Sequence, residues 1–226
     1  YMEKLTKPQE SITDQIIKLI KINRISTTEV ADCMGKSGLF ADAKPIQQGM
    51  FKVGKVRWMY AYNDSNWTIH EIAREIEPGE IVMIESFNCG ERSTIGELVS
   101  KYMLLYQQAE AIITNQNMRD ANSLLRERFS IWCKGFSPIG CFNTKCPEPL
   151  DPEIYKEHYE RYQGSIAVCD DSGVVIIPKE LQTEEFYQKL VAIEDQEDIW
   201  FDCLDHRKWD TFDIVCLKKY RNTGDK

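Results

Sequence analysis

The chain has 226 residues, of which 42% are hydrophobic, and this composition is typical of one globular domain with an appendage. Its formal net charge of -8 argues against a broad nucleic-acid-binding surface, because such surfaces carry a basic face. No stretch approaches the ~20 apolar residues of a membrane span, and the start of the chain lacks the layout of a signal peptide, so we expect a cytoplasmic protein with no direct contact to nucleic acid or membrane.

The first part of the chain predicts two helices. Apolar residues at helical spacing indicate an amphipathic helix over 12–22. Ser26 and Glu29 match a capping box, which predicts a second helix that Gly35 ends. We expect residues 1–25 to form an N-terminal helical segment ahead of the main domain.

The middle of the chain predicts alternating strands and helices. The strand segments are rich in β-branched and aromatic residues or are short apolar runs, and the helix segments carry apolar residues at helical spacing. Such alternation is typical of an α/β fold. The expected elements are strand 53–62, helix 67–76, strand 81–84, helix 97–109, strand 111–114, helix 122–129 and strand 131–133.

The last part predicts a loop, a hairpin and a helical tail. The expected elements are a proline-rich loop over 141–152, a helix over 152–161, and strands 164–168 and 174–177 joined by a turn. From Thr183 onward a charged helix leads into an aromatic tail. Because large apolar groups avoid water, we expect this tail to pack on the body or on a neighbouring subunit.

Eight cysteines are spread along the chain without a C-x-x-C pair, which argues against a zinc ribbon and a thioredoxin-type motif. Reduced, mostly buried thiols are the ordinary interpretation. Cys141 and Cys146 flank a loop, so a contact between them or with a metal stays open.

Two short stretches point to a small-anion pocket with a carboxylate beside it. Gly96 opens the helix expected at 97–109, so free backbone amides cluster there and favour a carboxylate or phosphate. Arg119 and Asp120 follow a predicted strand, at the strand-to-loop edge where α/β proteins usually place their chemistry. A guanidinium can bind a ligand carboxylate with two hydrogen bonds. The neighbouring Asp120 offers a hard oxygen to Mg²⁺ or Mn²⁺.

Six parts of the chain, in order along roughly residues 26–180, carry a family resemblance. They are Ser26-Thr27-Thr28-Glu29-Val30-Ala31-Asp32, His70-Glu71 with Glu77-Pro78-Gly79-Glu80-Ile81-Val82, Gly96-Glu97-Leu98, Arg119-Asp120, Lys134-Gly135-Phe136-Ser137-Pro138-Ile139-Gly140, and Gly164-Ser165-Ile166-Ala167-Val168 through Asp171-Ser172-Gly173-Val174-Val175-Ile176-Ile177-Pro178. Together they resemble the regulator of ribonuclease activity A (RraA)-like family. Its enzymatic relatives are the metal-dependent 4-hydroxy-4-methyl-2-oxoglutarate/4-carboxy-4-hydroxy-2-oxoadipate aldolases.

The resemblance implies an α/β sandwich of the swivelling β/β/α type with helical N-terminal and C-terminal extensions. The RraA-like domain would cover residues 26–180, and residues 181–226 would form the C-terminal extension. The family assembles as a homotrimer or hexamer, with the site at a subunit boundary.

The resemblance also implies roles for single residues. The substrate, a small 2-oxo acid, would be bound by Gly96, Glu97, Leu98, Val99 and Arg119. The divalent metal, Mg²⁺ or Mn²⁺, would be held by Asp120, with Glu97 steadying its waters. Arg119, Asp120 and Glu97 would then be the catalytic residues of a lyase.

The implied reaction is a class II aldol cleavage or the decarboxylation of oxaloacetate. Both pass through the enolate of pyruvate, whose negative charge the metal and Arg119 would share. A metal-bound water is the expected proton acceptor.

The chain also departs from the family pattern. Asn115 and Gln116 stand where the family has Asp-Gly, and Gln cannot easily replace a Gly that needs a positive φ. Ser123 stands where the family has an acidic residue. These departures favour the alternative function, a non-catalytic RraA-like regulator that binds a protein partner such as a ribonuclease.

Other interpretations of the single residues also stay open. Arg119 and Asp120 could form a strand-end ion pair and an N-cap for the next helix. Gly96 could only relieve crowding between two elements. His70 is most simply an ordinary core or surface histidine.

Overall fold

The computed structural model describes residues 10–222, so the first nine and the last four residues of the predicted terminal segments lie outside the described part. Its strands are β1 (Lys44–Pro45), β2 (Lys52–Tyr62), β3 (Ile81–Phe87), β4 (Ala111–Thr114), β5 (Asn117–Met118), β6 (Ile131–Cys133), β7 (Gly135–Phe136), β8 (Ile166–Asp170) and β9 (Gly173–Ile177). Seven of them form one sheet, in the order β1-β6-β4-β3-β2-β8-β9, and β5 pairs with β7. The predicted α/β fold is confirmed.

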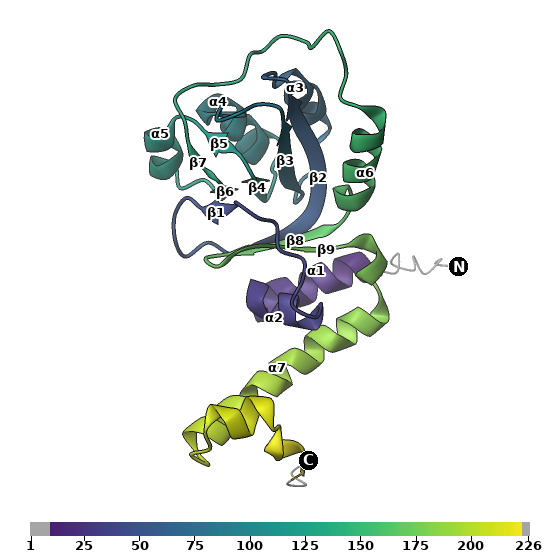
Figure 1. Cartoon of the computed structure of the whole chain (residues 1–226), viewed down its shortest axis with the longest axis vertical. Helices are drawn as coiled ribbons and strands as arrows, with labels where there is room; N and C mark the ends of the chain where they lie inside the picture. Colours follow the sequence, from purple (N-terminus) through teal and green to yellow (C-terminus); the bar gives the residue numbers. More distant parts are fainter. Residues whose placement is uncertain (1–9, 223–226) are drawn as a thin grey trace, which may run out of the picture.

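The four central strands β6, β4, β3 and β2 run parallel, whereas β1, β8 and β9 pair in antiparallel fashion at the two sides. The two ends of the sheet approach each other, because β1 contacts β9 and the Phe40 amide before β1 donates to the Val174 carbonyl at 3.0 Å. The sheet is therefore nearly closed on itself (Figure 1).

The helices connect and cover these strands (Figure 1). They are α1 (Ile12–Asn23), α2 (Thr27–Cys33), α3 (Trp67–Ile72), α4 (Glu97–Lys101), α5 (Ala121–Arg126), α6 (Pro152–Tyr162) and α7 (Glu184–Asp205), with short 3₁₀ turns at Ala73–Glu75, Lys179–Leu181 and Lys219–Asn222 and π-helical turns at Tyr102–Tyr106 and Phe212–Cys216. The predicted capping box is present, because Ser26 and Glu29 bond to each other's backbone amides. The helix predicted over 97–109 ends at Tyr106 and changes to π-helical geometry at Tyr102.

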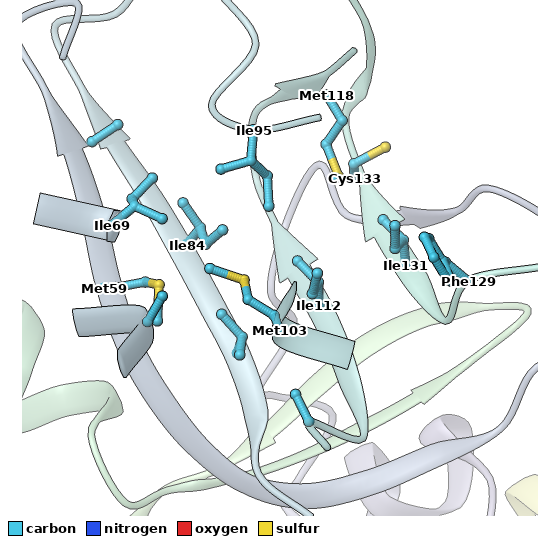
Figure 2. Packing of buried hydrophobic residues seen from close by; sticks show 14 of the residues in the cluster. Met59, Ile69, Ile84, Ile95, Met103, Ile112, Met118, Phe129, Ile131 and Cys133 are labelled. Atoms are coloured by element: carbon cyan, nitrogen blue, oxygen red, sulfur yellow. The ribbon is translucent and has the colours of Figure 1, made fainter. Parts of the chain in front are cut away.

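A hydrophobic cluster lies between the sheet and the helices α3, α4 and α5, and it anchors the segments that carry the predicted site residues (Figure 2). Ile84 and Ile112 from the parallel strands contribute to it, and both are fully buried. Ile95 and Met118 belong to the same cluster. Each of these two residues directly precedes a predicted site residue, so packing holds the two chain segments side by side.

The hairpin β8–β9 separates two further clusters. Alternate residues face opposite sides, as the two-residue period of a strand requires. Ala167 and Cys169 pack with Trp58 on the inner side of the curved sheet. Ile166 and Val168 pack against the layer formed by α1, α2 and α7.

The C-terminal segment packs on the body only in part. Phe186 and Leu190, in the first half of α7, are buried against the N-terminal helices. Beyond them, the π-helical turn at Phe212–Cys216 contacts α7 itself, and this end extends away from the sheet (Figure 1). Contact with a neighbouring subunit stays a prediction. None of the helices within residues 10–222 has the length and apolar character needed to cross a membrane.

Candidate active site

The strand-end segment after β4 carries the two charged residues that the sequence singled out. Met118 is fully buried, and the next amide, that of Arg119, donates to the Ile95 carbonyl at 3.1 Å. This bond ties the segment to the residue before Gly96. The side chains of Arg119 and Asp120 are 51% and 43% exposed, so both reach the surface.

Gln116 fits this segment without the positive φ that a glycine at this position of the family suggested. Its φ is not positive, in contrast to that of Asp120 at 61°. The Gln116 side-chain amide donates to the Gly90 carbonyl at 2.7 Å, and its oxygen accepts the Asn117 amide at 3.0 Å. The departure from the family pattern is therefore stabilised by hydrogen bonds of the side chain itself.

Asp120 turns toward α4 and not toward its own helix. Its carboxylate Oδ2 accepts the Glu97 amide at 2.9 Å and lies 3.8 Å from Arg119 Nε. Although Asp120 occupies the N-cap position of α5, its side chain makes no capping bond there. The alternative of an ion pair and an N-cap is therefore met in part: Asp120 pairs with Arg119 and is the N-cap residue of α5, but its carboxylate bonds to the start of α4 instead of capping its own helix.

Gly96 is required by this close approach. A Cβ at this position would lie 2.2 Å from Asp120 Oδ2 and 2.7 Å from Arg119 Cγ. A second glycine, Gly140, also faces the guanidinium, since a Cβ there would lie 3.0 Å from Arg119 Nη1. The Arg119 side chain therefore occupies space that is open because Gly96 and Gly140 have no side chains.

A small cavity of about 90 Å³ opens beside these residues and includes Gly96, Arg119 and Asp120 in its lining. Asn66 and Thr94 also line it and are 6% and 1% exposed. Neither Asn66 Oδ1 nor Thr94 Oγ1 has a hydrogen-bond partner within residues 10–222. Because buried polar atoms are normally paired, these two oxygen atoms indicate that a water molecule or a polar ligand occupies the cavity. Neither residue belongs to a motif that marks it as a site residue in the sequence.

The remaining predicted residues lie at the start of α4. Leu98 and Val99 line the cavity, but the Leu98 side chain is 82% exposed, so the Leu98 backbone amide is the group that could face a ligand. Glu97 contributes its backbone amide to Asp120. The six predicted site residues are therefore brought together.

The donor set near the cavity suits a weakly held divalent ion. Among the described residues no group of three or more His, Cys, Asp or Glu side chains could hold a metal. Asp120 uses Oδ2 for the Glu97 amide, and Oδ1 has no hydrogen bond within the described residues. Mg²⁺ is commonly bound through one or two carboxylates and keeps several waters. Asp120 therefore fits such an ion as its single protein ligand.

The cysteines make separate contacts. Cys146 donates to the Tyr62 carbonyl at 3.2 Å. A hydrogen bond between the thiols of Cys89 and Cys141 lowers the pKa of Cys89 and, together with burial, raises the pKa of Cys141. All eight cysteines are free thiols, so no bond joins Cys141 to Cys146.

The geometry is that of an α/β protein in which Arg119 and Asp120, at the edge of the parallel strands, meet the start of α4 at Gly96. Residues 27–176 match the family model RraA-like, described as Aldolase/RraA. The chain belongs to this RraA-like family, as the resemblance in the sequence predicted.

Two curated relatives are similar to the chain. A protein of Halalkalibacterium halodurans, named "Putative 4-hydroxy-4-methyl-2-oxoglutarate aldolase", is 23% identical over 186 residues, which are 76% of this chain and 80% of the relative. Protein DlpA of Legionella pneumophila is 21% identical over 195 residues, 81% of this chain. The match spans only 30% of DlpA, so this chain corresponds to a part of that protein.

Solved structures share the fold. An uncharacterized protein from Pseudomonas syringae superposes with a TM-score of 0.68 at 16% identity, covering 91% of this chain and 98% of the other. RraAS2 from Streptomyces coelicolor, described as an unusual member of the RNase ES inhibitor RraA protein family, gives a TM-score of 0.63 at 15% identity, covering 81% and 93%.

Proposed function

We propose that the protein is a divalent-metal-dependent lyase that acts on a small anionic 2-oxo acid through a pyruvate enolate. One observation carries the proposal: Arg119 and Asp120 lie against Gly96, at the start of α4 and at the rim of a small polar cavity. Family membership and a relative named as an aldolase support it.

Different residues of the site have different roles in the proposed reaction. The Arg119 guanidinium binds the substrate carboxylate and stabilises the negative charge that grows as the enolate forms. The amides of Leu98 and Val99 offer further donors at the helix start, which continues as π-helix to Tyr106. Asp120 would hold Mg²⁺ or Mn²⁺, with Glu97 beside it. When bound, the ion would act as a Lewis acid on the 2-oxo group.

Pyruvate release from oxaloacetate and from 4-hydroxy-4-methyl-2-oxoglutarate, with Mg²⁺ or Mn²⁺ and after chelation, tests the proposal. We expect Arg119→Ala to lower kcat/KM by roughly 100-fold or more, the usual effect of removing a group that stabilises transition-state charge. Asp120→Ala should abolish the response to metal. Both side chains are about half exposed, so both variants should fold.

Arg126→Ala is the matched control, because Arg126 is an exposed arginine of neighbouring α5 whose only ion pair is with Glu127 at 3.6 Å within the described residues. It should keep wild-type activity. A wild-type protein that releases no pyruvate with either metal would refute the proposal.

A specific feature also favours a second candidate, a regulator that binds a protein. Leu98, Leu105 and Tyr106, on the helix that starts at the cavity, are 82%, 54% and 73% exposed. Large exposed apolar patches mark interaction sites. RraAS2 is described as a member of an RNase inhibitor family. Capture of a ribonuclease by the wild type that Leu98→Ser abolishes, and that Arg119→Ala leaves intact, would support this candidate.

A further inference from the structure

His70 lies at the rim of the cavity that contains Arg119. The chain has three histidines. His158 pairs with Glu85 at 2.8 Å, and His206 pairs with Asp202 at 3.0 Å. The exposed ring of His70 has no hydrogen bond or ion pair within residues 10–222, and His70 lines the same cavity as Gly96 and Asp120. It is therefore the histidine that a ligand of this cavity can meet.

The backbone holds His70 firmly relative to the site. The His70 amide donates to the Asn66 carbonyl at 3.3 Å. The Asn66 side chain in turn donates to the Thr94 carbonyl at 2.9 Å, two residues before Gly96. The first turn of α3 is thus tied to the segment that leads into α4, so the backbone of His70 is held beside the cavity.

The cavity continues outward past His70. His70 and Asn143 line both the small cavity and an adjoining open hollow of about 430 Å³, which Trp67 and Arg74 also line. A ligand whose 2-oxo acid end lies at Arg119 can therefore extend past the imidazole toward the hollow. The part of the ligand beyond its 2-oxo group would meet His70.

The other titratable groups near His70 are poor bases for a neutral hydroxyl. In the cavity, Arg119 is a cation, and Asp120 accepts the Glu97 amide and would hold the metal ion in the proposed function. The pKa of Cys141 is raised by its hydrogen bond with Cys89 and by burial, so this thiol keeps its proton. In the outer hollow lie Arg74, another cation, and Glu71, whose exposed carboxylate is a weak base for a hydroxyl group.

We propose that His70, and not the metal-bound water expected from the family resemblance, is the base that removes the proton of the 4-hydroxyl group of a 4-hydroxy-2-oxo acid, an inference that rests on the proposed lyase function. The imidazole takes the hydroxyl proton, and the O–H electron pair becomes the second bond of a new C4 carbonyl. The C3–C4 bond breaks, and its electron pair stays on C3 as the pyruvate enolate. Return of the proton from the imidazolium to C3 gives pyruvate and a second carbonyl compound.

Decarboxylation of oxaloacetate separates this role from ligand binding. Its C3–C4 bond also breaks to leave the enolate of pyruvate, but CO₂ departs from a carboxylate that has no proton to lose. A base for a hydroxyl group is therefore needed in the aldol cleavage only. Loss of His70 should affect the two reactions very differently.

The experiment compares the wild type, His70→Asn and His206→Asn in pyruvate release from 4-hydroxy-4-methyl-2-oxoglutarate and from oxaloacetate, with Mg²⁺ present. We expect His70→Asn to lower kcat of the aldol cleavage by roughly 100-fold or more, the usual range for general base catalysis. Oxaloacetate decarboxylation should stay within about threefold, as should the affinity for oxalate measured by calorimetry, since neither needs the base. His206→Asn should match the wild type in all three measurements.

The outcomes separate the two proposals. No pyruvate from either substrate with the wild type would refute the lyase function, and this inference with it. If the wild type is active on both substrates and His70→Asn lowers both rates equally, or lowers neither, the lyase function stands and the base is not His70. An unchanged aldol rate would assign the hydroxyl proton to an acceptor other than His70.

Discussion

Replacement of Gly96 by alanine tests the geometry on which the site depends. The added methyl would lie 2.2 Å from Asp120 Oδ2, 2.7 Å from Arg119 Cγ and 3.0 Å from Arg119 Nε. The backbone itself tolerates alanine, because a φ of -134° and a ψ of -156° belong to the extended region. The whole effect must therefore come from displacement of these two side chains.

The expected loss of stability is small. Overpacking usually costs about 1–3 kcal/mol, and both displaced side chains can swing toward solvent because they are about half exposed. We expect about 1 kcal/mol at the low end of that range, which lowers Tm by about 2–4 °C in a chain of this size.

The expected loss of ligand affinity is larger. A displaced Arg119 gives up a charge-assisted hydrogen bond to the ligand carboxylate, worth about 1.5–3 kcal/mol. This corresponds to roughly a 10- to 100-fold rise in Kd. Calorimetric titration with oxalate and Mg²⁺ measures the change, and thermal unfolding followed by circular dichroism measures the stability.

Gly135→Ala is the control for this substitution, because a Cβ there would approach only Asn117 Oδ1, at 3.3 Å. It should leave oxalate affinity unchanged. In an Asp120→Ala background, Gly96→Ala should cost less stability than in the wild type, since the closest contact is gone. An oxalate Kd within twofold of the wild type in Gly96→Ala would refute the reasoning.

Two further predictions concern stability. Glu85→Ala leaves the Trp58 Nε1–H and His158 without the carboxylate that now accepts from Trp58 at 2.8 Å and pairs with His158 at 2.8 Å. The free energy of unfolding in urea should fall by about 2–4 kcal/mol, and a fall under about 0.5 kcal/mol would mean that water replaces the carboxylate. Ser26→Ala removes the cap shared with Glu29 and should cost about 1 kcal/mol, whereas no change would mean that α2 is held by packing alone.

Local patterns predicted the elements of the fold because their causes are local. The capping box at Ser26 and the apolar run over 111–114 identify a helix start and a strand from neighbouring residues alone. The change to π-helix at Tyr102 was not predictable, since it depends on how the helix meets the rest of the body. The sequence also did not predict that the segment after α7 folds back on α7 itself.

The site residues could be named from the sequence, but their arrangement could not. Gly96 and Arg119 meet because Ile95 and Met118 enter the same hydrophobic cluster, which is a long-range effect. The left-handed backbone of Asp120 has no clear local signal, so its contact with Glu97 was missed.

His70 and Asn66 were not identified as site residues for a related reason. The sequence around His70 is that of an ordinary helix face, and Asn66 lies in a turn-like polar run. Only the tertiary fold brings both to the cavity beside Arg119. An unpaired amide oxygen deep in the protein is visible in the structure alone.

A crystal structure of the protein grown with Mg²⁺ and oxalate tests the central claim most directly. We expect one carboxylate of oxalate between the Arg119 guanidinium and the amides at the start of α4, with the ion beside Asp120. Oxalate bound elsewhere would contradict the proposed site. So would a structure in which no anion lies at Arg119 and Asp120 still accepts the Glu97 amide.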